Sequence, residues 1–406
     1  MIQSDSHPLH TIEKEKAIIF ILALFQFLHI LDFVIMMPLG PVFMESFHIN
    51  SAKFGLLVSS YSISAGVCGF LGALFLDKFD RKNTLILLFS GFAFGTLLCS
   101  LAHTYGFFLF ARIVAGGFGG LIGATVLSII GDIIPVFRRG KATGVVMSAF
   151  SVSSVVGIPI GLYLANLYGW HFPFLMLAVF SFLALPVAYI ILPPIRIHLE
   201  SRIVAVSQWK SLQEVLTTKS HFAPFGFMVT LIFGGFTVIP FLSPYLVSNA
   251  GLAKSELPLV YFFGGMFTFF TSRYIGILAD RYGKFKVYQI VTGLSIFPIT
   301  IVTTLGHTNL IKILTITTFF MIFVSGRMVP AFAMITSSVA PRIRGSFMSV
   351  NSAIQQIASG LASFVAGMIL VQNTDKSLQN YELVGMIAVF CLVFSVFLAR
   401  KIKIAG

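Results

Sequence analysis

The stretch DKFDRK at residues 77–82 returns as DRYGK at residues 280–284, and each copy lies between two long apolar runs. The two copies are 203 residues apart, counted from Asp77 to Asp280. Only 10% of the 406 residues are charged, so a dense charged cluster in a repeated context indicates duplication rather than chance. The pattern predicts a membrane protein of two similar halves, which place the same loop on the same membrane face.

The composition fits a bilayer and excludes a water-soluble domain. Hydrophobic residues make up 57% of the chain, whereas a soluble domain of this length needs a polar surface. A membrane-spanning helix needs roughly 20 apolar residues. Twelve such runs lie at 17–41, 54–76, 84–103, 107–130, 142–166, 171–192, 223–248, 257–279, 287–306, 310–334, 346–371 and 382–399. We therefore predict an all-α membrane protein with twelve transmembrane helices in two six-helix halves.

The basic residues are unevenly distributed over the loops. If the N-terminus is cytoplasmic, twenty Lys and Arg residues fall in inner loops and tails, and four fall in outer loops. This asymmetry is the positive-inside pattern that sets orientation during insertion. We therefore expect both termini in the cytoplasm, in a bacterial cytoplasmic (inner) membrane. The net charge of +13 then suits anionic lipid headgroups, and we expect no nucleic-acid partner.

The longest polar stretch between apolar runs comes after the sixth run. It opens with two prolines, carries four basic residues and includes a short predicted surface helix from Gln208 to Leu216. We predict a six-helix bundle at 1–192, a cytoplasmic linker at 193–222 and a second six-helix bundle at 223–406.

A second pair of loops supports the duplication. PVFRRG at 135–140 follows the fourth run, and PRIRG at 341–345 follows the tenth. Arg139 and Arg344 are 205 residues apart, close to the spacing of the first pair. Parallel repeats of this kind place the substrate site between the halves, near the middle of the membrane.

These motifs resemble those of the major facilitator superfamily, most closely its drug/proton antiporter and sugar-efflux branch. That family's loop motif is Gly-x-x-x-Asp-Arg/Lys-x-Gly-Arg/Lys-Arg/Lys. The first half matches it at 73–82, where Ala73 and Asp80 replace the two glycines, and the second half matches at 276–284. The resemblance covers all twelve helices, and it implies a transporter that works by alternating access.

Two further helix motifs carry the resemblance. The fourth helix matches a family motif at RIVAGG, residues 112–117. The fifth helix is similar to the family's efflux motif, through Gly157, Pro159 and Gly161. Glycines at four-residue spacing can also serve only to let two helices pack closely, which is the alternative interpretation of this motif.

The charged loops contain candidates for a conformational latch. The candidates are Asp77, Arg81 and Asp132 in the first half and Asp280, Arg281 and Lys284 in the second. Opposite charges at a membrane edge can join helices through charge-assisted hydrogen bonds. The resemblance implies a latch that bridges the halves on the cytoplasmic side and holds one access state. The alternative is that these residues only determine topology in a solvated loop.

Asp32 is the only acidic residue well inside an apolar run. A buried carboxylate must be paired, protonated or in contact with water. Asp32 lies about 15 residues into an outward-running helix and Arg112 about 5 residues into an inward-running one, so both lie roughly 22 Å from the inner face of a ~30 Å core. We hypothesise that Asp32 is the proton-coupling group and that Arg112 and His29 tune its proton affinity. The alternative is a permanent ion pair that positions the first helix.

Polar residues within the apolar runs are candidates for the substrate cavity. They are Gln26, Tyr61, Ser148, Ser151, Thr230, Tyr245, Asn351 and Gln355. Taken singly, each could instead form a hydrogen bond between helices.

Several functions are excluded by missing motifs. The sequence has no Gly-x-x-x-x-Gly-Lys-Ser/Thr phosphate loop and no clustered catalytic residues, so we expect neither a nucleotide-driven pump nor an enzyme. Cys68, Cys99 and Cys391 fall in separate runs, and we expect no metal, no cofactor and no disulfide. We predict a monomeric secondary transporter whose partners are protons, a small organic substrate (drug-like or sugar-like) and the lipid bilayer. We expect proton-coupled efflux, with proton-coupled uptake of a sugar or other nutrient as the alternative.

Overall fold

The structure is a computed structural model of the chain. It describes residues 12–72, 74, 78–196 and 208–402.

The helices of the first half follow one another with short connections. They are α1 (Ile12–Ile35), α2 (Gly40–Ser46), α3 (Ser51–Gly72), α4 (Arg81–Ser100), α5 (Tyr105–Ile133), α6 (Val136–Val152), α7 (Ile158–Tyr168) and α8 (His171–Ile191). A π-helical turn, η2 (Ser153–Gly157), joins α6 to α7. The described helices therefore account for the first six predicted runs.

The second half has the same order of long helices. It comprises η4 (Lys219–His221), α11 (Phe222–Phe236), η5 (Ile239–Phe241), α12 (Leu242–Ser248), η6 (Lys254–Glu256), α13 (Leu257–Tyr282), α14 (Lys284–Thr303), α15 (Leu310–Gly326), α16 (Met328–Ser337), η7 (Pro341–Ile343), α17 (Arg344–Ile369) and α18 (Tyr381–Arg400). Two short antiparallel strands, β1 (Val371–Gln372) and β2 (Leu378–Gln379), precede α18. Before this half, α10 (Gln208–Thr217) forms where the sequence predicts a surface helix.

Twelve segments cross the bundle, as the sequence predicts. In the described residues, eleven helical stretches are long and apolar enough to span a membrane. The twelfth is α13, which has 26 residues but carries Arg273, Asp280 and Arg281 and is therefore less apolar. Elements begin and end within a few residues of the predicted boundaries, apart from the first and from the fifth, whose helix α6 begins six residues early at Val136. The predicted run 17–41 is two helices, because α1 ends at Ile35 and α2 begins at Gly40, with Pro41 in its first turn.

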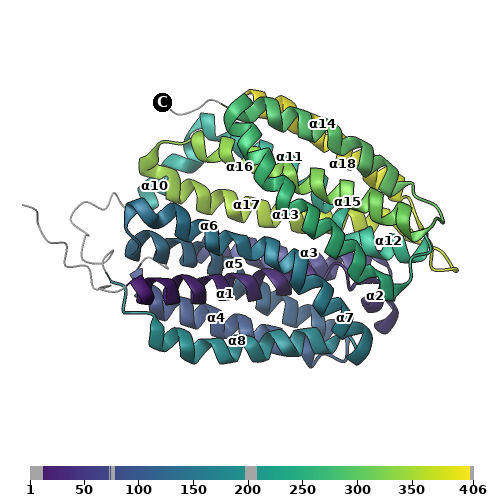
Figure 1. The fold of residues 1–406 in the computed structure, drawn as a ribbon, viewed down its shortest axis with the longest axis horizontal. Coiled ribbons are helices and arrows are strands. Elements are labelled where there is room, and N and C mark those ends of the chain that lie inside the picture. Colours follow the sequence, from purple (N-terminus) through teal and green to yellow (C-terminus); the bar gives the residue numbers. More distant parts are fainter. Residues whose placement is uncertain (1–11, 73, 75–77, 197–207, 403–406) are drawn as a thin grey trace, which may run out of the picture.

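The two halves lie side by side along the bundle (Figure 1). Helices α1, α4, α5, α6 and α8, coloured purple to teal, lie along one side, and the green to yellow helices from α11 to α18 lie along the other. The helix α10 lies at one end, here called the linker end. The helices α2 and α12 lie at the other, here called the α2 end.

Close glycine contacts join the halves. A Cβ on Gly55 of α3 would lie 2.7 Å from the backbone oxygen of Ser363 and 3.1 Å from the Cα of Gly367, both on α17. A Cβ on Gly265 of α13 would lie 3.0 Å from the backbone of Ser154 in η2. Small residues at these positions let helix backbones approach closely, which is how helices associate in a bilayer.

Candidate functional site

The centre of the candidate site is a buried ion pair between α1 and α5. Arg112 donates from Nη1 to Oδ2 of Asp32 over 2.8 Å, and both side chains are at most 1% exposed. Thr96 of α4 donates from Oγ1 to Oδ1 of Asp32 over 3.2 Å. The pairing expected from the depths of Asp32 and Arg112 is therefore confirmed. Thr96 is a partner that the sequence analysis did not identify.

Tyr61 of α3 forms the wall next to Arg112. The Cζ of Arg112 lies 4.4 Å from the centroid of the Tyr61 ring, which is a cation–π contact. A Cβ on Gly116 of α5 would overlap the backbone carbonyl of Tyr61. Glycine at this position of the fourth-helix motif therefore lets α3 come close enough for the ring to reach the guanidinium.

A strip of buried polar atoms without hydrogen-bond partners extends from the ion pair. It contains the Tyr61 hydroxyl, both ring nitrogens of His29 and Oε1 of Gln26. A Cβ on Gly119 of α5 would overlap the Tyr61 hydroxyl and lie 3.3 Å from Nε2 of His29. A Cβ on Gly123 would lie 3.6 Å from Nε2 of Gln26. Buried polar atoms are normally satisfied, so this strip is suited to water or to the polar groups of a substrate.

The fifth-helix motif packs against α1 beside Asp32. A Cβ on Gly157 would lie 2.8 Å from the methyl groups of Leu31, and a Cβ on Gly161 would overlap the end of Ile35. Pro159 lies in the first turn of α7 and has no N–H to donate, so the preceding turn widens to the π form. The motif therefore shapes the helix that lies against the ion pair.

The remaining cavity candidates differ in their hydrogen bonds. Neither amide atom of the buried Asn351 has a partner. Ser148 and Thr230 donate to carbonyls of their own helices, and the Tyr245 ring lies 4.4 Å from that of Tyr381. Ser151 and Gln355 are half-buried. The structure thus brings Gln26 and Tyr61 to the ion pair, and Asn351 is a further unsatisfied polar group.

The first-half latch residues lie at the linker ends of α4 and α5. Arg81 and Asp132 form an ion pair, with 2.5 Å between Nε and Oδ2. Asp77 lies outside the described residues. The pair ties two helices of the same half together, and the predicted bridge between the halves stays a prediction.

The second-half latch residues make neutral contacts. Lys284 donates from Nζ to Oγ of Ser337 over 3.0 Å. Asp280 is exposed, and the Cζ of Arg281 lies 5.3 Å from the centroid of the adjacent Tyr282 ring. Lys284 therefore joins α14 to α16 as Arg81 joins α4 to α5, but through a hydroxyl.

Charged contacts close the α2 end. Glu45 of α2 pairs with Lys254 of η6, and Lys376 of the β-hairpin lies 3.6 Å from the same carboxylate. The hydrogen bond and the charge of Lys254 hold the pKa of the Glu45 carboxyl below its usual value. These contacts join the first half to the second.

At the linker end, a charged contact lies within one half. Arg138 pairs with Glu15 over 2.9 Å, and both belong to the first half. At the α2 end, by contrast, the Glu45–Lys254 pair joins the two halves. Among the described residues, the two ends thus differ in whether an ion pair crosses between the halves.

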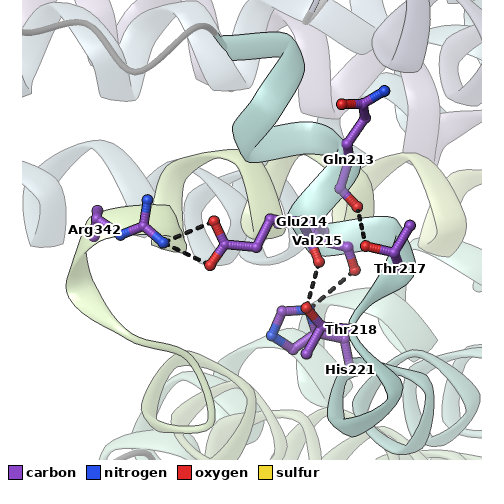
Figure 2. A network of polar contacts seen from close by, with 7 residues as sticks. All are labelled: Gln213, Glu214, Val215, Thr217, Thr218, His221 and Arg342. Carbon is purple, nitrogen blue, oxygen red and sulfur yellow. Dashed lines mark hydrogen bonds and ion pairs between the residues drawn. The ribbon is translucent and has the colours of Figure 1, made fainter.

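The linker helix is fixed to the second half. Figure 2 shows Arg342 of η7 donating from Nη2 to both carboxylate oxygens of Glu214, over 2.6 and 2.7 Å. In the same network the buried His221 donates from Nδ1 to the carbonyl of Val215 over 3.0 Å. Both oxygens accept from the same nitrogen, and this charge-assisted contact joins α10 to the second half.

Known proteins share this fold and sequence pattern. The chain is 22% identical over 384 residues to the uncharacterized MFS-type transporter YceJ of Bacillus subtilis, covering 92% of this chain and 93% of that protein. It is 27% identical over 222 residues to Multidrug resistance protein 2 of the same organism, covering 55% of each.

Two solved structures show the same fold. A bacterial homolog of the human lysosomal transporter Spinster, inward-facing and unoccupied, matches with a TM-score of 0.75 at 15% identity, over 97% of this chain and 98% of that one. A D-xylose–proton symporter matches with a TM-score of 0.74 at 18% identity, over 94% and 97%. The sequence profile described as Major Facilitator Superfamily matches residues 22–363 and 225–402. The chain therefore belongs to the Major Facilitator Superfamily of transporters.

Proposed function

We propose that the protein exports a small organic compound, drug-like or sugar-like, in exchange for protons. The observation that carries this proposal is the fully buried Asp32, held by Arg112 and Thr96 and bordered by unsatisfied polar atoms. A membrane-embedded carboxylate is costly to maintain and marks ion or proton pathways in transporters. The name of the multidrug-resistance relative supports efflux of an organic compound.

The ion pair supplies a simple coupling device. While Arg112 holds Asp32, the guanidinium charge favours the ionised carboxylate; without it, a buried carboxyl favours the neutral acid. A shift of α1 against α5 within the first half that separates the two groups would load a proton, and renewed pairing would release it. His29 and Tyr61 lie beside the pair, and their proposed role is to pass the proton or to bind the substrate.

Alternating access is supported by the unequal ends of the bundle. The Glu45–Lys254 pair joins the halves at the α2 end, whereas the Arg138–Glu15 pair at the linker end lies within the first half. With the predicted topology, we propose that this is a state closed on the outer side. In the opposite state, Asp77, Asp280 and Arg281 would meet partners across the closing linker end and act as the proposed latch.

The test is transport in proteoliposomes with an imposed pH gradient, screened with cationic dyes, sugars and nucleosides. We expect the wild type to move one of these classes against its gradient, in the direction opposite to the protons. Asp32→Asn keeps the shape of the side chain and should abolish gradient-driven movement while leaving counterflow. The matched control is Asp375→Asn, the same change on the exposed β-hairpin, which should transport normally.

Two results would contradict the proposal. Movement of substrate and protons in the same direction would make the protein an uptake symporter. Proton-driven transport by Asp32→Asn would remove Asp32 as the coupling group.

A further inference from the structure

The second half contains a buried arginine that has no carboxylate partner among the described residues. Arg327 lies between α15 and α16 and is 1% exposed. Its Nη1 donates to Oγ of Ser295 over 3.2 Å, and its Nε has no partner. A buried charge that is not neutralised costs several kcal/mol or more. The site is therefore incomplete as it stands.

The side chains around Arg327 are neutral. Ser295 donates its own hydrogen to the carbonyl of Thr292 over 2.7 Å, so its oxygen is free to accept from the arginine. The hydroxyls of Tyr288 and Ser395 share a hydrogen bond of 2.5 Å, and the buried hydroxyl of Thr292 has no partner. These hydroxyls can solvate a small charged group but cannot cancel the charge of a guanidinium.

A glycine faces the guanidinium. A Cβ on Gly235 of α11 would lie 3.3 Å from Nη2 of Arg327, so this side of the arginine has no opposing side chain. Gly235 is 203 residues after Asp32, the spacing that also relates Asp77 to Asp280. In the first half this position supplies the carboxylate that neutralises an arginine, and in the second half it supplies none.

Arg327 lies within a continuous membrane-spanning stretch. Its N–H donates to the carbonyl of Phe323 over 3.2 Å and its carbonyl accepts from the N–H of Ala331 over 3.3 Å, so α15 and α16 form one apolar stretch from Leu310 to Ser337. Two observations thus coincide inside this stretch: an unneutralised cation and a missing side chain.

We propose that Arg327 forms a binding site for one monovalent anionic group, with Ser295 and Thr292 as supporting hydroxyls. The group is either a free anion such as chloride or a carboxylate on the transported compound. The carboxylate of a transported compound as ligand rests on the proposed function, whereas the anion site itself does not.

The experiment measures binding rather than transport, so its failure differs from a failure of the proposed function. Thermal unfolding of the purified full-length protein is followed in detergent, in sodium isethionate at constant ionic strength. Chloride and benzoate are then titrated separately, as a free anion and as a carboxylate. We expect at least one of them to raise the melting temperature saturably, by about 4 °C at one hundred times its dissociation constant.

Variants assign the effect to the site. Arg327→Gln should lose the anion response, whereas Arg273→Gln, at an exposed arginine of α13, should keep it. Gly235→Asp would supply the carboxylate from the protein and should be stable without added anion. Gly235→Asn has the same shape without the charge, and it should lack both the anion response and the added stability.

Each result of the titration either supports or overturns the anion site. A response to chloride alone identifies a free anion, and a response to benzoate identifies a carboxylate site; either supports the proposal. No response of the wild type to either anion would overturn it. An equal response in the Arg327→Gln protein would overturn it as well.

Discussion

The two halves of the molecule share one fold but neutralise their cations differently. In the first half, Arg112 contacts the carboxylate of Asp32 and Arg81 contacts that of Asp132. Both arginines are therefore paired with an acid, one buried inside the bundle and one at its linker end.

In the second half the corresponding partners are neutral. Lys284, 203 residues after Arg81, donates to Ser337, which is 205 residues after Asp132. Arg327 donates to Ser295. Among the described residues, each half thus retains a cation at its linker end, and this cation contacts an acid in the first half and a hydroxyl in the second. The difference supports the proposal that proton coupling belongs to the first half and that the second half binds another ligand.

The largest expected difference comes from removing the two buried arginines. Arg112→Met removes the partner of the buried Asp32 carboxyl and should lower the free energy of unfolding by about 3–5 kcal/mol. Arg327→Met removes an unneutralised charge and should be neutral or stabilising by about 1–4 kcal/mol in anion-poor buffer. Denaturant unfolding in mixed micelles measures both. Equal losses in the two variants would show that the halves neutralise these arginines alike.

A smaller difference is expected at the linker end. Asp132→Asn weakens a charge-assisted bond to Arg81 and should cost about 1.5–3 kcal/mol, whereas Ser337→Ala removes a hydroxyl acceptor from Lys284 and should cost about 0.5–1.5 kcal/mol. Thermal unfolding ranks the two variants, and the transport assay shows whether the first-half pair matters for turnover. A larger cost for Ser337→Ala would reverse the comparison.

The smallest effect concerns the contact that joins the halves at the α2 end. Lys254 lowers the pKa of Glu45 below its usual value of 4.5. The ion pair therefore stabilises closure of the α2 end fully above pH 4.5. This contribution is lost as the pH falls through the lowered pKa. The pair is partly exposed, so its worth is about 0.2–1 kcal/mol, at most roughly a fivefold shift in the equilibrium. Spin-label distances between α2 and the β-hairpin at pH 7 and pH 4 should report the opening.

The control for this pH effect is Glu45→Gln, which cannot ionise. It should show the same distances at both pH values, close to those of the wild type at pH 4. An unchanged pH response in this variant would place the titrating group elsewhere.

Much of this arrangement could be predicted from the sequence, because helices in a bilayer have a fixed rise per residue. Apolar runs located the twelve crossings, and counting residues placed Asp32 and Arg112 at one level. Thr96 could not be predicted, since a hydroxyl in an apolar run has no special pattern. The isolation of Arg327 could not be predicted either, because it depends on which residues neighbouring helices present.

The π-helical turn Ser153–Gly157 has a consequence for every side chain beyond it. Such a turn holds one residue more than an α-turn, so the stretches before and after it are out of phase by about 100°. Deleting one residue from this turn would rotate α7 by that angle and carry Gly161 away from Ile35, which would then face a bulkier neighbour. The number of residues in this turn therefore decides which side of α7 packs against α1. The identity of any single residue in the turn matters less for this contact.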